Sequence, residues 1–179
     1  MKFGTALFIF VGCLAGSVFA QEESDEQLIL EALHPLPNAL RDDATVVTWN
    51  DAGERRMVRK GTNNWICHSD LPGPGYVVSC YPKSLDPFEV CKRSKRLKGI
   101  GRDEAWGLCE EEIDEGKFSM PDYAVALTVF GTSRKTALPL SIIRLPYATA
   151  ESTNLPTEPD SFHPWIHNPG TLDAHIMFP

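Results

Sequence analysis

After the first twenty residues, the apolar positions begin with a helical period. Ser24 and Gln27 have the spacing of a capping box, in which each side chain satisfies the backbone N–H of the other residue. Four apolar residues then fall on one helical face: Leu28, Ile29, Ala32 and Leu33. Because Pro35 and Pro37 cannot continue a helix, the pattern predicts a short amphipathic helix that ends before them.

From residue 45 to residue 81 the period changes to two, which is typical of strands. Apolar and polar residues alternate on both sides of "NDAG", residues 50–53, and Gly53 can adopt the positive φ that a hairpin turn requires. The pattern predicts a hairpin of strands 45–49 and 55–59. Two further strands are expected at 65–68 and 76–81, on either side of a turn at "SDLPGPG".

The helical period returns after residue 85. Asp86 is expected to cap a helix through Lys98, with Pro87 at its first position, and a second helix is expected at about 103–113. Strand patterns follow in "YAVALTVFG" and "TALPLSIIRLPY", where prolines mark edges or breaks in pairing, and again at 174–178. The sequence therefore predicts an α+β fold, with a mainly antiparallel sheet and two or three short helices.

Disulfides are expected to staple this fold. Four cysteines follow the first twenty residues, Cys67, Cys80, Cys91 and Cys109, and an even number in an exported chain favours disulfides. Three connectivities are open. We favour Cys67–Cys80 and Cys91–Cys109, because each closes a short local loop. A zinc site made of all four is the alternative, although no C-x-x-C pair supports it.

Residues 1–20 have the features of an export signal: Lys2 precedes a short apolar run, and Val18 and Ala20 stand at the cleavage positions. They predict a periplasmic or secreted protein whose residues 21–179 form a single globular domain. A helical insert at about 85–114 and a proline-rich C-terminal segment at 147–179 are expected within it. In the alternative interpretation, Phe10 to Cys13 form a lipid-attachment box, and Cys13 becomes the first residue of a lipoprotein.

Charge and hydropathy limit the classes of partner that we expect. The chain has 17 basic and 24 acidic side chains, a net charge of −7, so we expect no nucleic-acid partner. No stretch is long and apolar enough for an integral membrane protein. The basic run "KRSKRLK", residues 92–98, could attract anions. We favour a solvated face that "EEEIDE", residues 110–115, neutralises from the next helix.

The C-terminal segment holds the candidate metal ligands, which are His163, His167, His175 and Met177. Imidazole and thioether bind copper well, and imidazole with carboxylate binds zinc, so a metal ion is the one cofactor that the sequence suggests. His175 and Met177 are two apart on a predicted strand and point to the same side, which makes them the better pair. The alternative is that both are partly buried packing residues.

Catalytic signatures are absent from the sequence, which contains no G-x-S-x-G, H-E-x-x-H, P-loop or dinucleotide motif. We therefore expect a non-enzymatic binding or envelope-associated domain, whose partner is a small ligand or an envelope component. A periplasmic copper- or zinc-binding protein is one alternative. A hydrolytic enzyme that uses His175 is another, and a deep pocket holding His175 and a carboxylate would favour it.

Two segments carry a family resemblance. "GTNNWIC", residues 61–67, and "PWIHNPGTLDAHIMFP", residues 164–179, resemble bacterial secreted proteins of uncharacterised function. Those proteins pair an early G-T-N-G-[FW]-x-C segment with a terminal P-[WY]-x-M-x-x-G-T-x-x-x-H-[IL]-M-x-P segment. The resemblance implies no activity, but it supports Cys67–Cys80, because Cys80 matches the second cysteine of the family. Asn64 and His167 depart from the family pattern.

A motif near each end of the domain suggests that the two segments meet in space. Under this hypothesis, four side chains line one polar ligand notch: Thr62, Asn63, Thr171 and His175.

Overall fold

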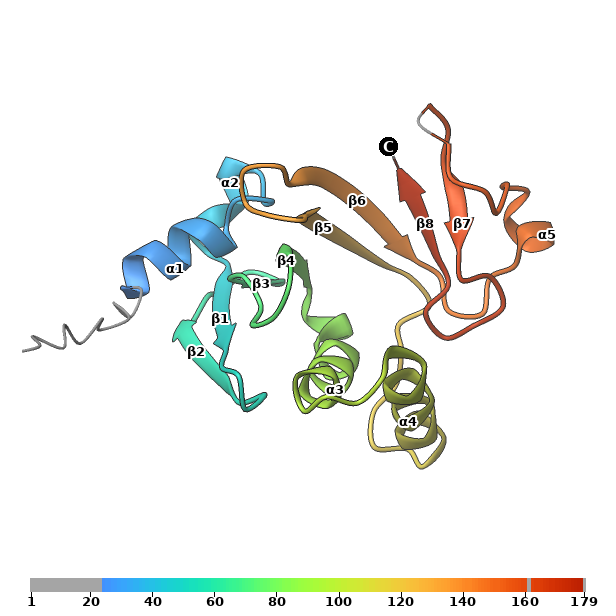
Figure 1. The fold of residues 1–179 in the computed structure, drawn as a ribbon, viewed down its shortest axis with the longest axis horizontal. Helices are drawn as coiled ribbons and strands as arrows, with labels where there is room; N and C mark the ends of the chain where they lie inside the picture. Colours follow the sequence, from blue (N-terminus) through green and yellow to red (C-terminus); the bar gives the residue numbers. More distant parts are fainter. Residues whose placement is uncertain (1–23, 161, 179) are drawn as a thin grey trace, which may run out of the picture.

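One eight-stranded sheet organises the protein (Figure 1). The computed structural model describes residues 24–160 and 162–178, so the expected export signal and Cys13 lie outside the described residues. The strands are β1 (Thr45–Trp49), β2 (Arg55–Arg59), β3 (Trp65–His68), β4 (Tyr76–Pro82), β5 (Ala124–Gly131), β6 (Leu138–Arg144), β7 (Trp165–His167) and β8 (His175–Phe178).

The strand order is β2-β1-β3-β4-β5-β6-β8-β7. All neighbours are antiparallel except β1 and β3, which run parallel with Val46 opposite Cys67. The predicted α+β class with a mainly antiparallel sheet is confirmed. The parallel pair was not expected, because residue patterns within a strand do not show which neighbour a strand selects.

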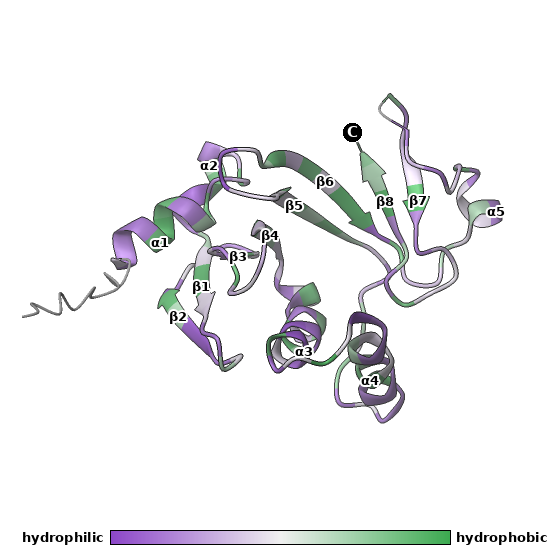
Figure 2. Ribbon diagram, in the orientation of Figure 1, coloured by the Kyte–Doolittle hydropathy of each residue, from purple (hydrophilic) through white to green (hydrophobic). Residues whose placement is uncertain are grey.

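Helices cover both faces of the sheet. They are α1 (Asp25–Ala32), α2 (Asn38–Arg41), α3 (Asp86–Leu97), α4 (Arg102–Asp114) and α5 (Ala150–Thr153), with a 3₁₀ turn at Lys83–Leu85. Adjacent residues of β1 point to opposite faces, so Val46 packs with Ala32 and Leu33 around α1, whereas Val47 packs with Phe88 and Cys109 of α3 and α4. Figure 2 shows β6 and β8 as mainly hydrophobic and α4 as mainly hydrophilic.

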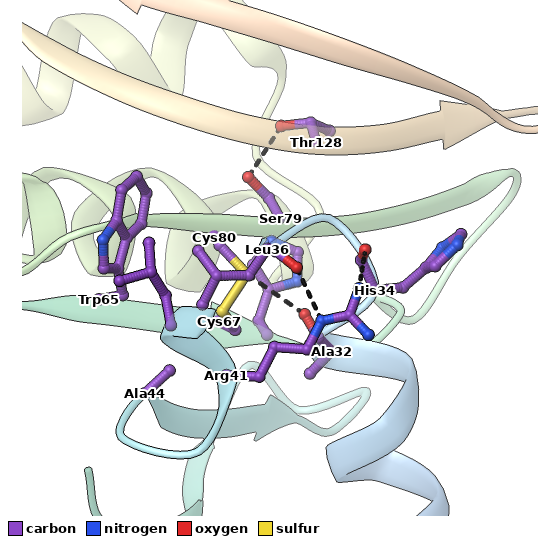
Figure 3. The surroundings of a disulfide bond; sticks show 12 residues. Ala32, His34, Leu36, Arg41, Ala44, Trp65, Cys67, Ser79, Cys80 and Thr128 are labelled. Carbon is purple, nitrogen blue, oxygen red and sulfur yellow. Dashed lines mark hydrogen bonds between the residues drawn. A yellow bond between two sulfur atoms is a disulfide. The ribbon is translucent and has the colours of Figure 1, made fainter. Parts of the chain in front are cut away.

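Each face carries one disulfide. Cys67 and Cys80 lie opposite each other on β3 and β4, beside the α1 cluster, and Figure 3 shows them next to Ala32 and Leu36. The second bond joins Cys91 of α3 to Cys109 of α4. Both predicted pairings are confirmed, and the four-cysteine zinc site is wrong because all four sulfurs are engaged in disulfides.

The helix beginning at residue 86 differs from the prediction in one detail. Leu85, not Asp86, is the N-cap residue, and Asp86 and Pro87 are the first two helical positions. The Asp86 carboxylate instead accepts hydrogen bonds from both terminal nitrogens of Arg55, each at 2.9 Å, and from the Tyr81 hydroxyl at 3.2 Å. Asp86 therefore ties α3 to β2 and β4, which fixes how α3 lies across the sheet.

The predicted capping box is present at α1, where Ser24 and Gln27 exchange hydrogen bonds of 3.1 and 3.3 Å. The short elements α2, α5 and β7 were not predicted. Each has only three or four residues, too few for a periodic pattern to appear. None of the helices in the described ranges has the length and apolar character that crossing a bilayer requires.

Candidate functional site

A cavity of about 740 Å³ lies between the sheet and the helices α3 and α4. Its floor comes from alternate residues of β4, β5, β6 and β8, its roof from α3 and α4, and one wall from the loop Asp70–Gly75. Its volume is in the range of ligand sites for small molecules.

Strand register decides which side chains reach the floor. Arg144 lies opposite Ala124 on one side and His175 on the other, and Ile142 lies between Ala126 and Met177 in the same way. Directly opposed residues of a ladder point to the same face of a sheet. Arg144, His175 and Met177 are thereby brought into one cavity, although more than thirty positions separate Arg144 from Met177.

Charged side chains gather at one end of this cavity. We call them the charged cluster: Glu89, Lys92 and Arg93 from α3, Arg144 from β6, Asp173 before β8, and His175. Lys92 and Arg93 follow Glu89 by three and four residues, so all three lie on one face of α3. The Glu89 carboxylate contacts Lys92 Nζ, Arg93 Nη2 at 2.6 Å and Arg144 Nε at 3.7 Å.

Asp173 forms the second anionic centre of the cluster. Its carboxylate pairs with Arg144 Nη1, accepts a hydrogen bond of 2.9 Å from Asn168 Nδ2, and lies 3.5 Å from Arg102 Nη2. Arg144 therefore bridges Glu89 on the helix and Asp173 on the last loop. This bridge holds the roof and the floor of the cavity together at the charged end.

The cluster has more buried cations than buried carboxylates. Three cations, each no more than 9% exposed, face the carboxylates of Glu89 and Asp173, which are 2% and 3% exposed. Among the described residues of the cluster, the buried donors Arg93 Nε and Arg144 Nε and the buried acceptor Glu89 Oε2 have no hydrogen-bond partner, although Arg144 Nε lies 3.7 Å from the Glu89 carboxylate. Because buried donors and charges are normally paired, the cluster has the electrostatic character of a site for an anion.

The pKa values of the cluster reflect this balance. Burial by itself raises the pKa of Glu89, but Lys92, Arg93 and Arg144 together lower it well below its usual range. Burial, followed by the charge of Arg144, lowers the pKa of Lys92 to about 7. Glu89 is therefore ionised at neutral pH. The ammonium form of Lys92 is destabilised by burial, and a further anion nearby would stabilise it.

His175 is neutral at physiological pH. Burial and the nearby Arg144 lower its pKa to about 4, and its Nδ1 lies 2.5 Å from the backbone oxygen of Asp173. Nδ1 therefore donates to that oxygen, which leaves Nε2 unprotonated. The same imidazole is 6% exposed, so it combines packing with a hydrogen bond to the backbone.

The four predicted metal ligands are only partly brought together. His167 lies opposite His175, with ring centroids 5.0 Å apart, and Met177 shares the floor with His175. His163 is exposed and bonded to Asp160 at 2.9 Å instead. In the described ranges, no three His, Cys, Asp or Glu side chains are grouped as a metal site would require.

The four residues of the predicted notch do not meet. Thr62 and Asn63 bond to Asp43 and Leu40 next to β3, at 2.8 Å in each case. Three strands separate β3 from β8, which corresponds to roughly 19 Å at ~4.8 Å per strand. Thr171 is exposed and donates to the backbone of Asn168. His175 is the one member of this set that lines the cavity. The predicted notch is therefore wrong, and His175 belongs to the charged cluster instead.

Sequence reasoning missed most of the cluster. The predicted solvated face, in which acidic residues neutralise the basic run at 92–98, describes Lys95 and Glu112, which pair at 2.8 Å. It is wrong for Lys92 and Arg93, which are buried against Glu89. One signal could have shown this: Glu89 has basic residues three and four positions later on the helix face that also carries apolar residues.

The resemblance to bacterial secreted proteins stays a prediction. Comparison with known proteins finds no matching family, no matching curated protein and no matching solved structure.

Proposed function

We propose that this protein is an exported, non-enzymatic binding protein whose charged cluster holds a small anionic ligand. The ligand class is carboxylate, phosphate or sulfate, because these groups accept hydrogen bonds from arginine and carry the charge that the cluster lacks. The two disulfides and the expected signal at residues 1–20 support an oxidising location outside the cytoplasm, the periplasm or the medium.

One observation carries the proposal. Lys92, Arg93 and Arg144 are buried in a cavity of about 740 Å³ with only two buried carboxylates, and two arginine Nε donors lack partners. Burying a charge is costly unless it is paired. An anion in the cavity would favour the ammonium form of Lys92, whose pKa burial lowers to about 7, and would supply an acceptor to the two arginine Nε donors.

Isothermal titration of the oxidised protein with acetate, phosphate and sulfate tests the proposal. We expect saturable, salt-sensitive binding of at least one of these anions, and a loss of at least tenfold in affinity in Arg93→Met. Arg134→Met is the matched control, since Arg134 is exposed and pairs with Glu31 outside the cavity. Equal binding by both variants would assign the anion to the surface and reject the cluster as its site.

A hydrolytic enzyme is the second candidate, because His175 and the Asp173 carboxylate do line one cavity. His175 has a neutral imidazole with a free Nε2, as a general base requires. In the described ranges no hydroxyl or thiol bonds to His175, so an attacking water would have to be the nucleophile. Ester hydrolysis that depends on pH near 4 and is abolished in His175→Gln would favour this candidate over simple binding.

A further inference from the structure

The cavity is much longer than its charged cluster. The floor consists of four rows of opposed residues, two positions apart along the strands. In order, they are Ala124–Arg144–His175, Ala126–Ile142–Met177, Ser79–Thr128–Leu140 and Val77–Phe130–Leu138. Ala124 and Leu138 complete their rows beside the cavity and do not line it. Successive rows are about 7 Å apart, so the fourth row lies roughly 20 Å from the first.

The polarity of the floor changes along this length. Arg144 and His175 make the first row charged, whereas the second row has only apolar side chains. In the third row, the hydroxyls of Ser79 and Thr128 bond to each other at 2.8 Å, so neither needs a partner from a ligand. Beyond the first row, the floor therefore offers apolar contact.

The outer end of the floor is exposed and apolar. Phe130 is 58% exposed and its strand partner Leu138 is 70% exposed, which is unusual for large apolar side chains on adjacent strands. Leu71, Pro72 and Pro74 of the neighbouring loop line the same cavity. An apolar surface thus continues from the interior to the mouth of the cavity.

From this gradient we infer that the ligand is a single-chain amphiphilic anion, with its head at the charged cluster and its apolar chain along the floor toward Phe130. This inference rests on the proposed function, because it uses the same cluster for the head group. A small inorganic anion would leave the apolar rows and most of the 740 Å³ without contact. An uncharged chain would leave the excess buried cations without a counter-charge.

Titration with a series of ligands tests the inference in the wild-type protein. The probes are acetate, octanoate, dodecanoate, tetradecanoate and the neutral dodecanol, each used below the concentration at which it forms micelles. Each methylene buried should tighten binding roughly threefold to fourfold, so dodecanoate should bind at least tenfold more tightly than octanoate. Dodecanol should bind at least tenfold more weakly than dodecanoate, because it lacks the charge.

Phe130→Ser locates the far end of the chain. The side chain is exposed, so this variant is expected to fold normally. It should weaken tetradecanoate at least threefold and leave octanoate unchanged, since an extended tetradecanoate ends near the Phe130 side chain that projects from the fourth row, whereas octanoate ends near the second row. Tyr123→Ser is the matched control, because Tyr123 is 67% exposed and does not line the cavity.

The outcomes separate this inference from the proposed function. If acetate and phosphate bind but longer carboxylates gain nothing, the amphiphile is rejected and the anion site stands. If none of the charged probes binds, both are rejected. If dodecanol binds as tightly as dodecanoate, the cluster does not hold the head group of the chain and the amphiphile is rejected, whereas the anion site then stands or falls with acetate and phosphate. Binding only to vesicles of phosphatidylglycerol, and not to free dodecanoate, would replace the single-chain ligand with a membrane surface.

Discussion

The two faces of the sheet are built differently. On the α1 face, the buried cluster consists of apolar side chains and a cystine: Ala32, Leu33, Leu36, Ala44, Val46, Cys67 and Cys80. The α3 and α4 face also has an apolar cluster and a cystine. However, it has five buried ionic side chains, where the α1 face has Glu31 alone among the described residues, and it has a cavity of about 740 Å³.

This difference bears on whether the buried ionic side chains are required for the stability of the fold. Replacing a buried ion network with apolar residues of similar volume is often neutral or stabilising, so buried charges are weak evidence for a role in stability. The α1 face shows that this sheet can be covered mainly by apolar residues, with one buried carboxylate, Glu31, that pairs with the exposed Arg134. The contrast therefore supports the proposal that the ionic side chains and the cavity of the second face bind a ligand.

The largest expected effect comes from breaking the charged cluster at its centre. Glu89→Gln leaves Lys92, Arg93 and Arg144 buried with one carboxylate among them, so it should lower the free energy of unfolding by about 3 to 5 kcal/mol. Urea unfolding measures this loss. Glu26→Gln on the exposed side of α1 is the control, with an expected change within about 0.5 kcal/mol.

A loss below about 1 kcal/mol in Glu89→Gln would contradict this account. It would mean that water reaches the cluster and screens its charges, and that the two faces do not differ in the way described.

The two disulfides allow a comparison of the two faces, because removing either one should lower the free energy of unfolding by nearly the same amount. They span 13 and 18 residues, so removing either should lower the free energy of unfolding by about 3 kcal/mol in the chain-entropy model. Ligand binding should separate them. The double variant Cys91→Ala with Cys109→Ala frees α3 from α4 and should weaken dodecanoate, whereas Cys67→Ala with Cys80→Ala should not.

Affinity is measured at a temperature where circular dichroism shows both double variants folded. Equal losses of affinity would mean that the α3–α4 bond does not position the roof of the cavity, and the binding role would then extend over both faces.

Acid should destabilise the second face first. His68 and His175 have pKa values lowered mainly by burial, so both are neutral in the folded protein at pH values where the unfolded chain, with pKa near 6.5, takes up protons. Stability therefore falls as pH decreases below about 6.5. Each imidazole should reduce the free energy of unfolding by about 1 to 2 kcal/mol between about pH 6.5 and pH 5.

The measurement is the slope of this free energy against pH in His68→Gln, His175→Gln and the wild type. Each substitution should remove about half of the slope, whatever its own effect on stability. Glu89 and Asp173 do not contribute above about pH 5, because their lowered pKa values affect stability only at more acidic pH. An unchanged slope in both variants would show that the two imidazoles titrate normally.

Most elements of the fold could be predicted from the sequence, but only a small part of the site. Residues 45–49 and 55–59 become β1 and β2 with the predicted bounds, because alternation and a turn glycine are local signals. The charged cluster depends on register: β6 must pair with β8 for Arg144 to lie beside His175. Pairing between distant strands is not encoded in any short pattern, so Asp173 and Arg144 could not be linked in advance.

The smallest expected effect separates two lysines of the same basic run. Lys95 is paired with Glu112 at the partly exposed α3–α4 contact, so Lys95→Ala should change the free energy of unfolding by less than about 1 kcal/mol. It should leave the affinity for dodecanoate unchanged. Lys92→Met, three residues earlier in the cluster, should weaken that affinity at least tenfold. Equal weakening by both variants would mean that the whole basic run attracts the anion from solution. The buried charges would then not distinguish the α3 and α4 face from the α1 face as a binding site.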